Sequence, residues 1–100
     1  LAEAWGVPAD KFFEVSERLW IRAIVERYGQ RVLSEVKPAR FRMALAAKDM
    51  LYALRAGFAR GQPLPHISAL AQIFLQAASL GGLSDADYTA VYRYLKKRSE

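Results

Sequence analysis

The stretch Gly61–Ser84, GQPLPHISALAQIFLQAASLGGLS, contains no Asp, Glu, Lys or Arg. Proline and glycine open it, and the pair Gly81-Gly82 follows its apolar part, so chain breaks are expected at both ends. Between these breaks the apolar residues repeat with a helical period, and the polar side consists of two serines and two glutamines. The pattern predicts a helix over residues 65–80 that is buried on most of its circumference. A membrane span would need a longer apolar run, of about 20 residues.

Three further helices are predicted around this one, over residues 9–28, 38–60 and 84–98. Asp10 lies near the start of the first helix and Gly29 suits its end, Pro38 suits the first position of the second, and Ser84 can cap the last. Short loops between such helices favour a compact all-α bundle of four main helices in an antiparallel up-down arrangement. We expect residues 1–100 to form a single helical-bundle domain, part of a longer chain because the sequence starts at Leu1.

The composition excludes several classes of site. The chain has no cysteine and one histidine, so disulfides, thiolate chemistry and multi-histidine metal sites are not possible within it. Hydrophobic residues make up 53% and charged residues 25%, which is typical of a globular chain. The N-terminal residues lack the basic start of a signal peptide, so the cytoplasm is the expected compartment. We expect no cofactor, no metal and no enzymatic activity.

Basic charge is concentrated in the first half of the chain. The net charge is +5, and residues 18–60 contain ten basic and three acidic residues. Arginine predominates there, and its planar guanidinium suits phosphate oxygens. The pattern predicts a non-catalytic module of a nucleic-acid-handling assembly that binds the phosphate backbone through a basic face. The candidate contacts are Arg22, Arg31, Arg40, Arg42, Lys48, Arg55 and Arg60.

The alternative is a protein–protein docking or dimerisation domain that does not bind nucleic acid. Twelve residues are aromatic, and a domain of this size leaves many of its residues at the surface. Surface aromatic residues are enriched at protein interfaces. The candidates are apolar residues that face away from the buried sides of the predicted helices or lie outside them, and partners would be other subunits or a second copy. They are Trp5, Ile21, Val25, Phe41, Tyr52 and Tyr94.

Two short segments resemble known motifs. The run LAEAWGVPADKFF at residues 1–13 resembles the middle of a helix-turn-helix, with the small residue Ala2 four positions before the turn glycine Gly6. Its second helix would offer mainly Asp10, Lys11 and Glu14 to DNA, and two of these are acidic. Arg60 and His66 resemble the catalytic pair of the helical HEPN ribonucleases, which makes a ribonuclease the third alternative. Two prolines interrupt the spacer where that family continues a helix, so we expect no catalysis at His66.

Overall fold

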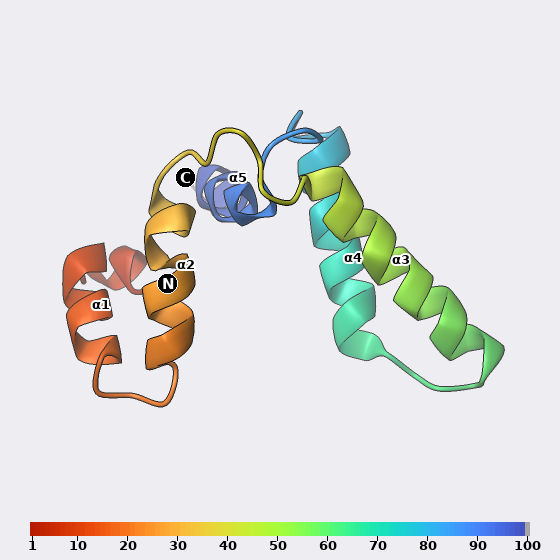
Figure 1. Ribbon diagram of the computed structural model, residues 1–100, viewed down its shortest axis with the longest axis horizontal. Helices are drawn as coiled ribbons and strands as arrows, with labels where there is room; N and C mark the ends of the chain where they lie inside the picture. Colours follow the sequence, from red (N-terminus) through yellow and green to blue (C-terminus); the bar gives the residue numbers. More distant parts are fainter. Residues whose placement is uncertain (100) are drawn as a thin grey trace. The chain divides into compact units, whose positions relative to one another are not determined.

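The computed structural model describes residues 1–99, which are helical and contain no β-strand. This confirms the all-α class, but five α-helices replace the four that were predicted, and the antiparallel up-down arrangement stays a prediction. The elements in chain order (Figure 1) are η1 (Glu3–Trp5), α1 (Ala9–Ser16), α2 (Arg22–Leu33), α3 (Met43–Ala59), α4 (Pro65–Ser79), η2 (Tyr88–Ala90) and α5 (Val91–Ser99). None of these helices is both long enough and apolar enough to cross a membrane.

The chain divides into two compact units. Unit 1 is Leu1–Ser34, with η1, α1 and α2, and unit 2 starts at Glu35 and contains the other elements. That residues 1–100 form one domain of a longer chain, and that it resides in the cytoplasm, stay predictions.

In unit 1, the helix predicted over residues 9–28 is interrupted. α1 ends at Ser16, which is buried and donates its hydroxyl to the carbonyl of Phe12 at 2.7 Å. α2 then starts at Arg22 and continues past Gly29. Gly29 therefore lies inside α2 and does not end a helix. A Cβ atom there would lie 3.2 Å from Cζ of Phe13. Its missing side chain instead lets the Phe13 ring pack against α2.

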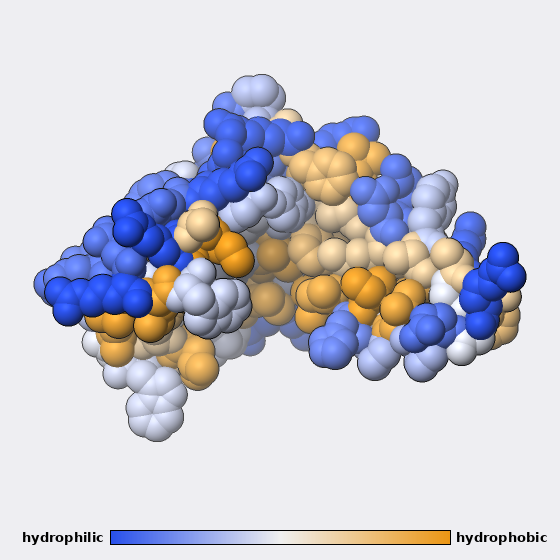
Figure 2. All heavy atoms as spheres, turned by 60° about the horizontal axis from the view of Figure 1, so that its bottom comes forward, coloured by the Kyte–Doolittle hydropathy of each residue, from blue (hydrophilic) through white to orange (hydrophobic). Residues whose placement is uncertain are grey.

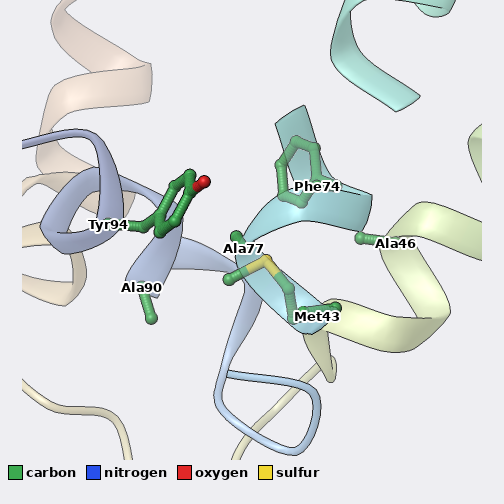
Figure 3. Packing of buried hydrophobic residues seen from close by; sticks show 7 residues of the cluster. Met43, Ala46, Phe74, Ala77, Ala90 and Tyr94 are labelled. Carbon is green, nitrogen blue, oxygen red and sulfur yellow. The ribbon is translucent and has the colours of Figure 1, made fainter. Parts of the chain in front are cut away.

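In unit 2, the buried core lies between α3, α4 and the C-terminal segment (Figure 3). Its members are Met43, Ala46, Phe74, Ala77, Ala78, Ala90 and Tyr94. α4 contributes Phe74 and two of the alanines and has four buried residues, more than any other helix within residues 1–99. The observed bounds Pro65–Ser79 agree with the predicted helix 65–80, and so does its central place in the core.

The helix predicted from Pro38 starts only at Met43. The backbone amides of Arg40 and Phe41 donate to the carboxylate of Asp87, which holds this segment in a non-helical conformation. The next amides, of Met43 and Ala44, donate to carbonyls in the loop that follows α4, at 2.9 and 3.1 Å. Amides in the first turn of a helix have no partner within the helix. The loop Ser84–Ala86 therefore caps α3 in place of a side chain.

The helix predicted over residues 84–98 also starts late, at Val91. Its expected start, Ser84–Asp87, is the loop that caps α3. Asp87 still caps a turn, because its carboxylate accepts a hydrogen bond from the amide of Thr89 at the start of η2. These capping contacts join segments that are far apart in the sequence.

Candidate functional site

A groove of about 280 Å³ lies between α3 and α4 in unit 2. Small residues open it, since alanines line both helices where longer side chains would fill the space. On α3 its residues are spaced three or four apart and so share one face of the helix. The lining residues are Ala44, Ala47, Lys48, Leu51, Leu54, Ala71, Gln72 and Leu75. Figure 2 shows apolar side chains at the surface on the α3–α4 side of the molecule, bordered by hydrophilic ones.

Two polar side chains line this groove, the ammonium of Lys48 and the amide of Gln72. Lys48 contacts Asp49 at 3.2 Å, with about half of its side chain exposed. Its Nζ atom also lies 5.6 Å from the centre of the Tyr52 ring. An ammonium and an amide N–H beside apolar walls can bind one anionic group attached to an apolar or aromatic body.

A second, more open hollow of about 560 Å³ lies on another side of α3. Apolar and aromatic side chains line it, and its one charged group is the carboxylate of Asp49. At its edge the rings of Phe41 and Tyr88 meet edge to face, with their centroids 5.9 Å apart. No cationic side chain lines this hollow, so it offers no positive charge to an anionic ligand. The groove with Lys48 is therefore the better candidate site.

The residues expected to bind nucleic acid do not form one group. Arg22 and Arg31 belong to unit 1, and the other five belong to unit 2. In unit 1, Arg22 donates to Glu26 at 2.7 Å, and this hydrogen bond raises the pKa of Arg22 above its ordinary value. The guanidinium of Arg31 lies 5.4 Å from the centre of the Tyr28 ring.

Within unit 2, acidic groups engage several of the predicted basic residues. Arg42 pairs with Asp85 at 3.3 Å, and Lys48 pairs with Asp49. Arg40 donates its backbone amide to Asp87. Arg55 is exposed on α3 and Arg60 is exposed at its end. Of the seven predicted residues, only Lys48 lines the groove.

The residues predicted for an interface differ in exposure. Trp5, Phe41 and Tyr52 are exposed, while Ile21 and Val25 are half-buried. The expectation that Tyr94 lies at the surface is wrong. Its side chain is 9% exposed and belongs to the core of unit 2, where a Cβ atom on Gly81 would touch its ring.

The two motif resemblances gain little from the geometry. Gly6 has a positive φ of 80°, which suits a turn, but the helix after it, α1, is only eight residues long. Arg60 lies at the end of α3, whereas His66 lies in the first turn of α4. As the two prolines predicted, no helix continues from Arg60 to His66.

The sequence did not identify Gln72 or the alanines as parts of a site. Gln72 was assigned only to the polar side of its helix. The alanine spacing on residues 44–54 indicated close helix packing, but not that part of the gap stays open. Which residues of α4 line the groove together with Lys48 depends on which turn of α4 lies opposite. No local sequence pattern gives that register.

Comparison with known proteins identifies a family. The family model described as "NAD-binding of NADP-dependent 3-hydroxyisobutyrate dehydrogenase" matches residues 1–95. No curated protein that was compared matches the chain.

This match corrects the expectations about function. The family is associated with an enzyme, so the prediction of a non-catalytic module in a nucleic-acid-handling assembly is wrong, as is the prediction that the protein has no enzymatic role. The expectation that nucleic acid is a partner is wrong for the same reason. The ribonuclease alternative is likewise replaced by a domain of a dehydrogenase family. Association with other subunits or with a second copy stays a prediction.

Proposed function

Since the chain belongs to the family described as NAD-binding of NADP-dependent 3-hydroxyisobutyrate dehydrogenase, we propose that it is the helical part of a dehydrogenase. Such an enzyme transfers a hydride between NADP and a short 3-hydroxy acid. The observation that carries this proposal is the extent of the match, which covers nearly the whole chain and both units. The nicotinamide ring supplies the hydride chemistry when it is bound, and the protein supplies binding and orientation.

The residues of this chain fit only a part of the cofactor. Proteins commonly hold a whole dinucleotide at a strand–turn–helix with the spacing G-x-G-x-x-G. Residues 1–99 contain no strand, and none of the six glycines of the chain has this spacing. The groove is also slightly smaller than typical ligand sites, which measure about 300–1,000 Å³. It fits one anionic group and the body next to it.

Within this limit, Lys48 binds the anionic oxygens and Gln72 donates a hydrogen bond to the same group. The anionic group is a phosphate of the cofactor or the carboxylate of the hydroxy acid, since both present the same oxygen chemistry to an ammonium. Leu51, Leu54 and Leu75 form the apolar wall. They exclude water from one side of the bound group, which strengthens the charge interaction there.

The test is a titration of the chain with NADPH and, separately, with 3-hydroxyisobutyrate, followed by amide chemical shifts in NMR. We expect shifts that are largest for groove residues on α3 and α4. Hydrogen bonds to a charged group contribute about 1.5–3 kcal/mol, so Lys48→Ala should weaken binding of the responding ligand about ten- to hundredfold.

The matched control is Lys97→Ala, which removes the same charge from an exposed position on α5. It should leave the Kd within about twofold of the wild type, because it touches no groove residue. Absence of groove shifts up to about 10 mM of either ligand would contradict the proposal, since a millimolar site would then be mostly filled. Equal losses in the two lysine variants would show that only overall charge matters.

A further inference from the structure

The ammonium of Lys48 has two neighbours of different chemistry. Nζ lies 3.2 Å from Oδ1 of Asp49 and 5.6 Å from the centre of the Tyr52 ring. Tyr52 lies one helical turn after Lys48, where residues four apart meet on the helix surface. Its side chain is 57% exposed and does not line the groove. Tyr52 is therefore linked to the groove by its contact with Lys48.

The two neighbours affect a bound anion in opposite ways. An aromatic ring attracts a cation through its quadrupole and leaves the positive charge in place. The Asp49 carboxylate attracts the same ammonium but competes with an anionic ligand for it. The ring can thus restrict where the ammonium lies without neutralising it, whereas the carboxylate cannot.

We propose that Tyr52 is a positioning residue, which holds the ammonium of Lys48 at the rim of the α3–α4 groove for an anionic ligand. This inference rests on the proposed function, because it assigns Lys48 to the ligand. Tyr52 does not touch the ligand. The ring face is the functional feature, so phenylalanine can replace tyrosine and leucine cannot.

The first measurement needs no ligand. The Tyr52 ring should shift the Hε resonances of Lys48 upfield in the wild type and in Tyr52→Phe. Tyr52→Leu should lose that shift while its amide spectrum elsewhere stays that of the folded chain. An unchanged Lys48 resonance in Tyr52→Leu would overturn the proposal, because the ring would then not hold the ammonium.

The second measurement is the Kd for the ligand that shifts the groove residues, NADPH or 3-hydroxyisobutyrate. An exposed cation–π contact contributes about 0.5–1 kcal/mol, so Tyr52→Leu should weaken binding about two- to fivefold while Tyr52→Phe retains it. In the Lys48→Gln background the same Tyr52→Leu change should have no effect, because it acts through the ammonium. Asp49→Asn should tighten binding, since it removes the competing carboxylate.

The outcomes separate this inference from the proposed function. If Lys48→Gln binds both NADPH and 3-hydroxyisobutyrate as well as the wild type does, the role of Lys48 is wrong and the inference falls with it. If Lys48→Gln loses binding but Tyr52→Leu retains it, only the positioning role is wrong. Equal weakening by Tyr52→Leu in both backgrounds would show a purely structural effect, and weaker binding by Asp49→Asn would assign the positioning role to the carboxylate.

Discussion

Replacing Asp87 with asparagine should make unit 2 much easier to unfold. Asp87 is 3% exposed, and its carboxylate accepts four hydrogen bonds. Oδ1 accepts from the amides of Arg40 and Phe41 at 2.9 and 3.2 Å, and Oδ2 accepts from the amide and hydroxyl of Thr89 at 3.2 and 2.6 Å. An asparagine amide has one oxygen. If this oxygen stays on the amides of Arg40 and Phe41, the NH₂ group faces the backbone amide of Thr89, which is also a donor, while the Thr89 hydroxyl can turn to accept. One of the four hydrogen bonds is therefore lost, and the others no longer involve a charged acceptor.

The expected loss follows from the kind of hydrogen bond. A hydrogen bond to a charged acceptor contributes about 1.5–3 kcal/mol, against about 0.5–1.5 kcal/mol for one between neutral groups. Since one bond is lost and the others lose their charged acceptor, we expect Asp87→Asn to lower the free energy of unfolding by about 3 kcal/mol. Typical domains have a free energy of unfolding of only about 5–15 kcal/mol.

Urea unfolding followed by far-ultraviolet circular dichroism tests this value. The transition of Asp87→Asn should move to a lower urea concentration than that of the wild type. The control is Asp85→Asn, which removes the same charge from a side chain that is 85% exposed and should cost less than about 1 kcal/mol. A loss below about 0.5 kcal/mol for Asp87→Asn would refute the reasoning.

The same carboxylate gives a dependence on pH. Burial raises the pKa of Asp87, but hydrogen bonds from Thr89, Phe41 and Arg40 together bring it below its ordinary value. In the unfolded chain an aspartate titrates near pH 3.9. The stabilisation is therefore complete above about pH 4 and is lost as the pH falls through the lower folded-state pKa. The difference in stability between wild type and Asp87→Asn should shrink in acid, and a constant difference would show that the charge is not its cause.

Four other substitutions test the core and the motifs. Phe74→Ala should lower the free energy of unfolding by about 3–5 kcal/mol, and Leu70→Ala, whose side chain is 40% exposed, by clearly less; equal losses in urea unfolding would contradict the observed burial. Gly81→Ala should destabilise unit 2 by at least about 1 kcal/mol, because its Cβ would lie 2.6 Å from the carbonyl oxygen of Ala77; an unchanged midpoint would show that the turn relaxes. His66→Ala should leave the Kd for NADPH unchanged, since His66 does not line the groove.

The sequence predicted those parts of the fold for which local signals suffice. The α4 helix has breakers at both ends and an apolar repeat between them, so its bounds agreed with the prediction. The break between α1 and α2 could not be predicted in this way. By its local preference Gly29 fits the end of a helix as well as its interior. Its packing against Phe13, which lies 16 residues earlier, is the reason for a glycine inside α2. The late start of α3 depends on Asp87, which lies far along the chain.

For the site, the sequence identified one residue and the wrong kind of partner. Lys48 was predicted to bind anions because it lies in a basic stretch, and it is the predicted cation that lines the groove. Gln72 was missed, since an amide on an otherwise apolar helix has no distinctive spacing. Tyr52 was assigned to an interface because it is aromatic and faces away from the core. Its contact with Lys48 follows from their spacing of four residues on one helix, which the sequence contains. This spacing points to a role at the groove only when Lys48 is known to line it.

The error about nucleic acid has a physical cause in how charge is distributed. Unit 1 contains five basic and five acidic residues, so its arginines add nothing to the net charge of +5. A long polyanion responds to the summed field of many charges, most of which must be unpaired. Here several of the basic side chains lie beside carboxylates, as the pairs Arg22–Glu26 and Arg42–Asp85 show. A small anionic ligand needs only one cation beside an apolar wall, and Lys48 meets that requirement. Under the proposed function, net charge therefore indicates the sign of the ligand's charge, while the groove limits the ligand's size.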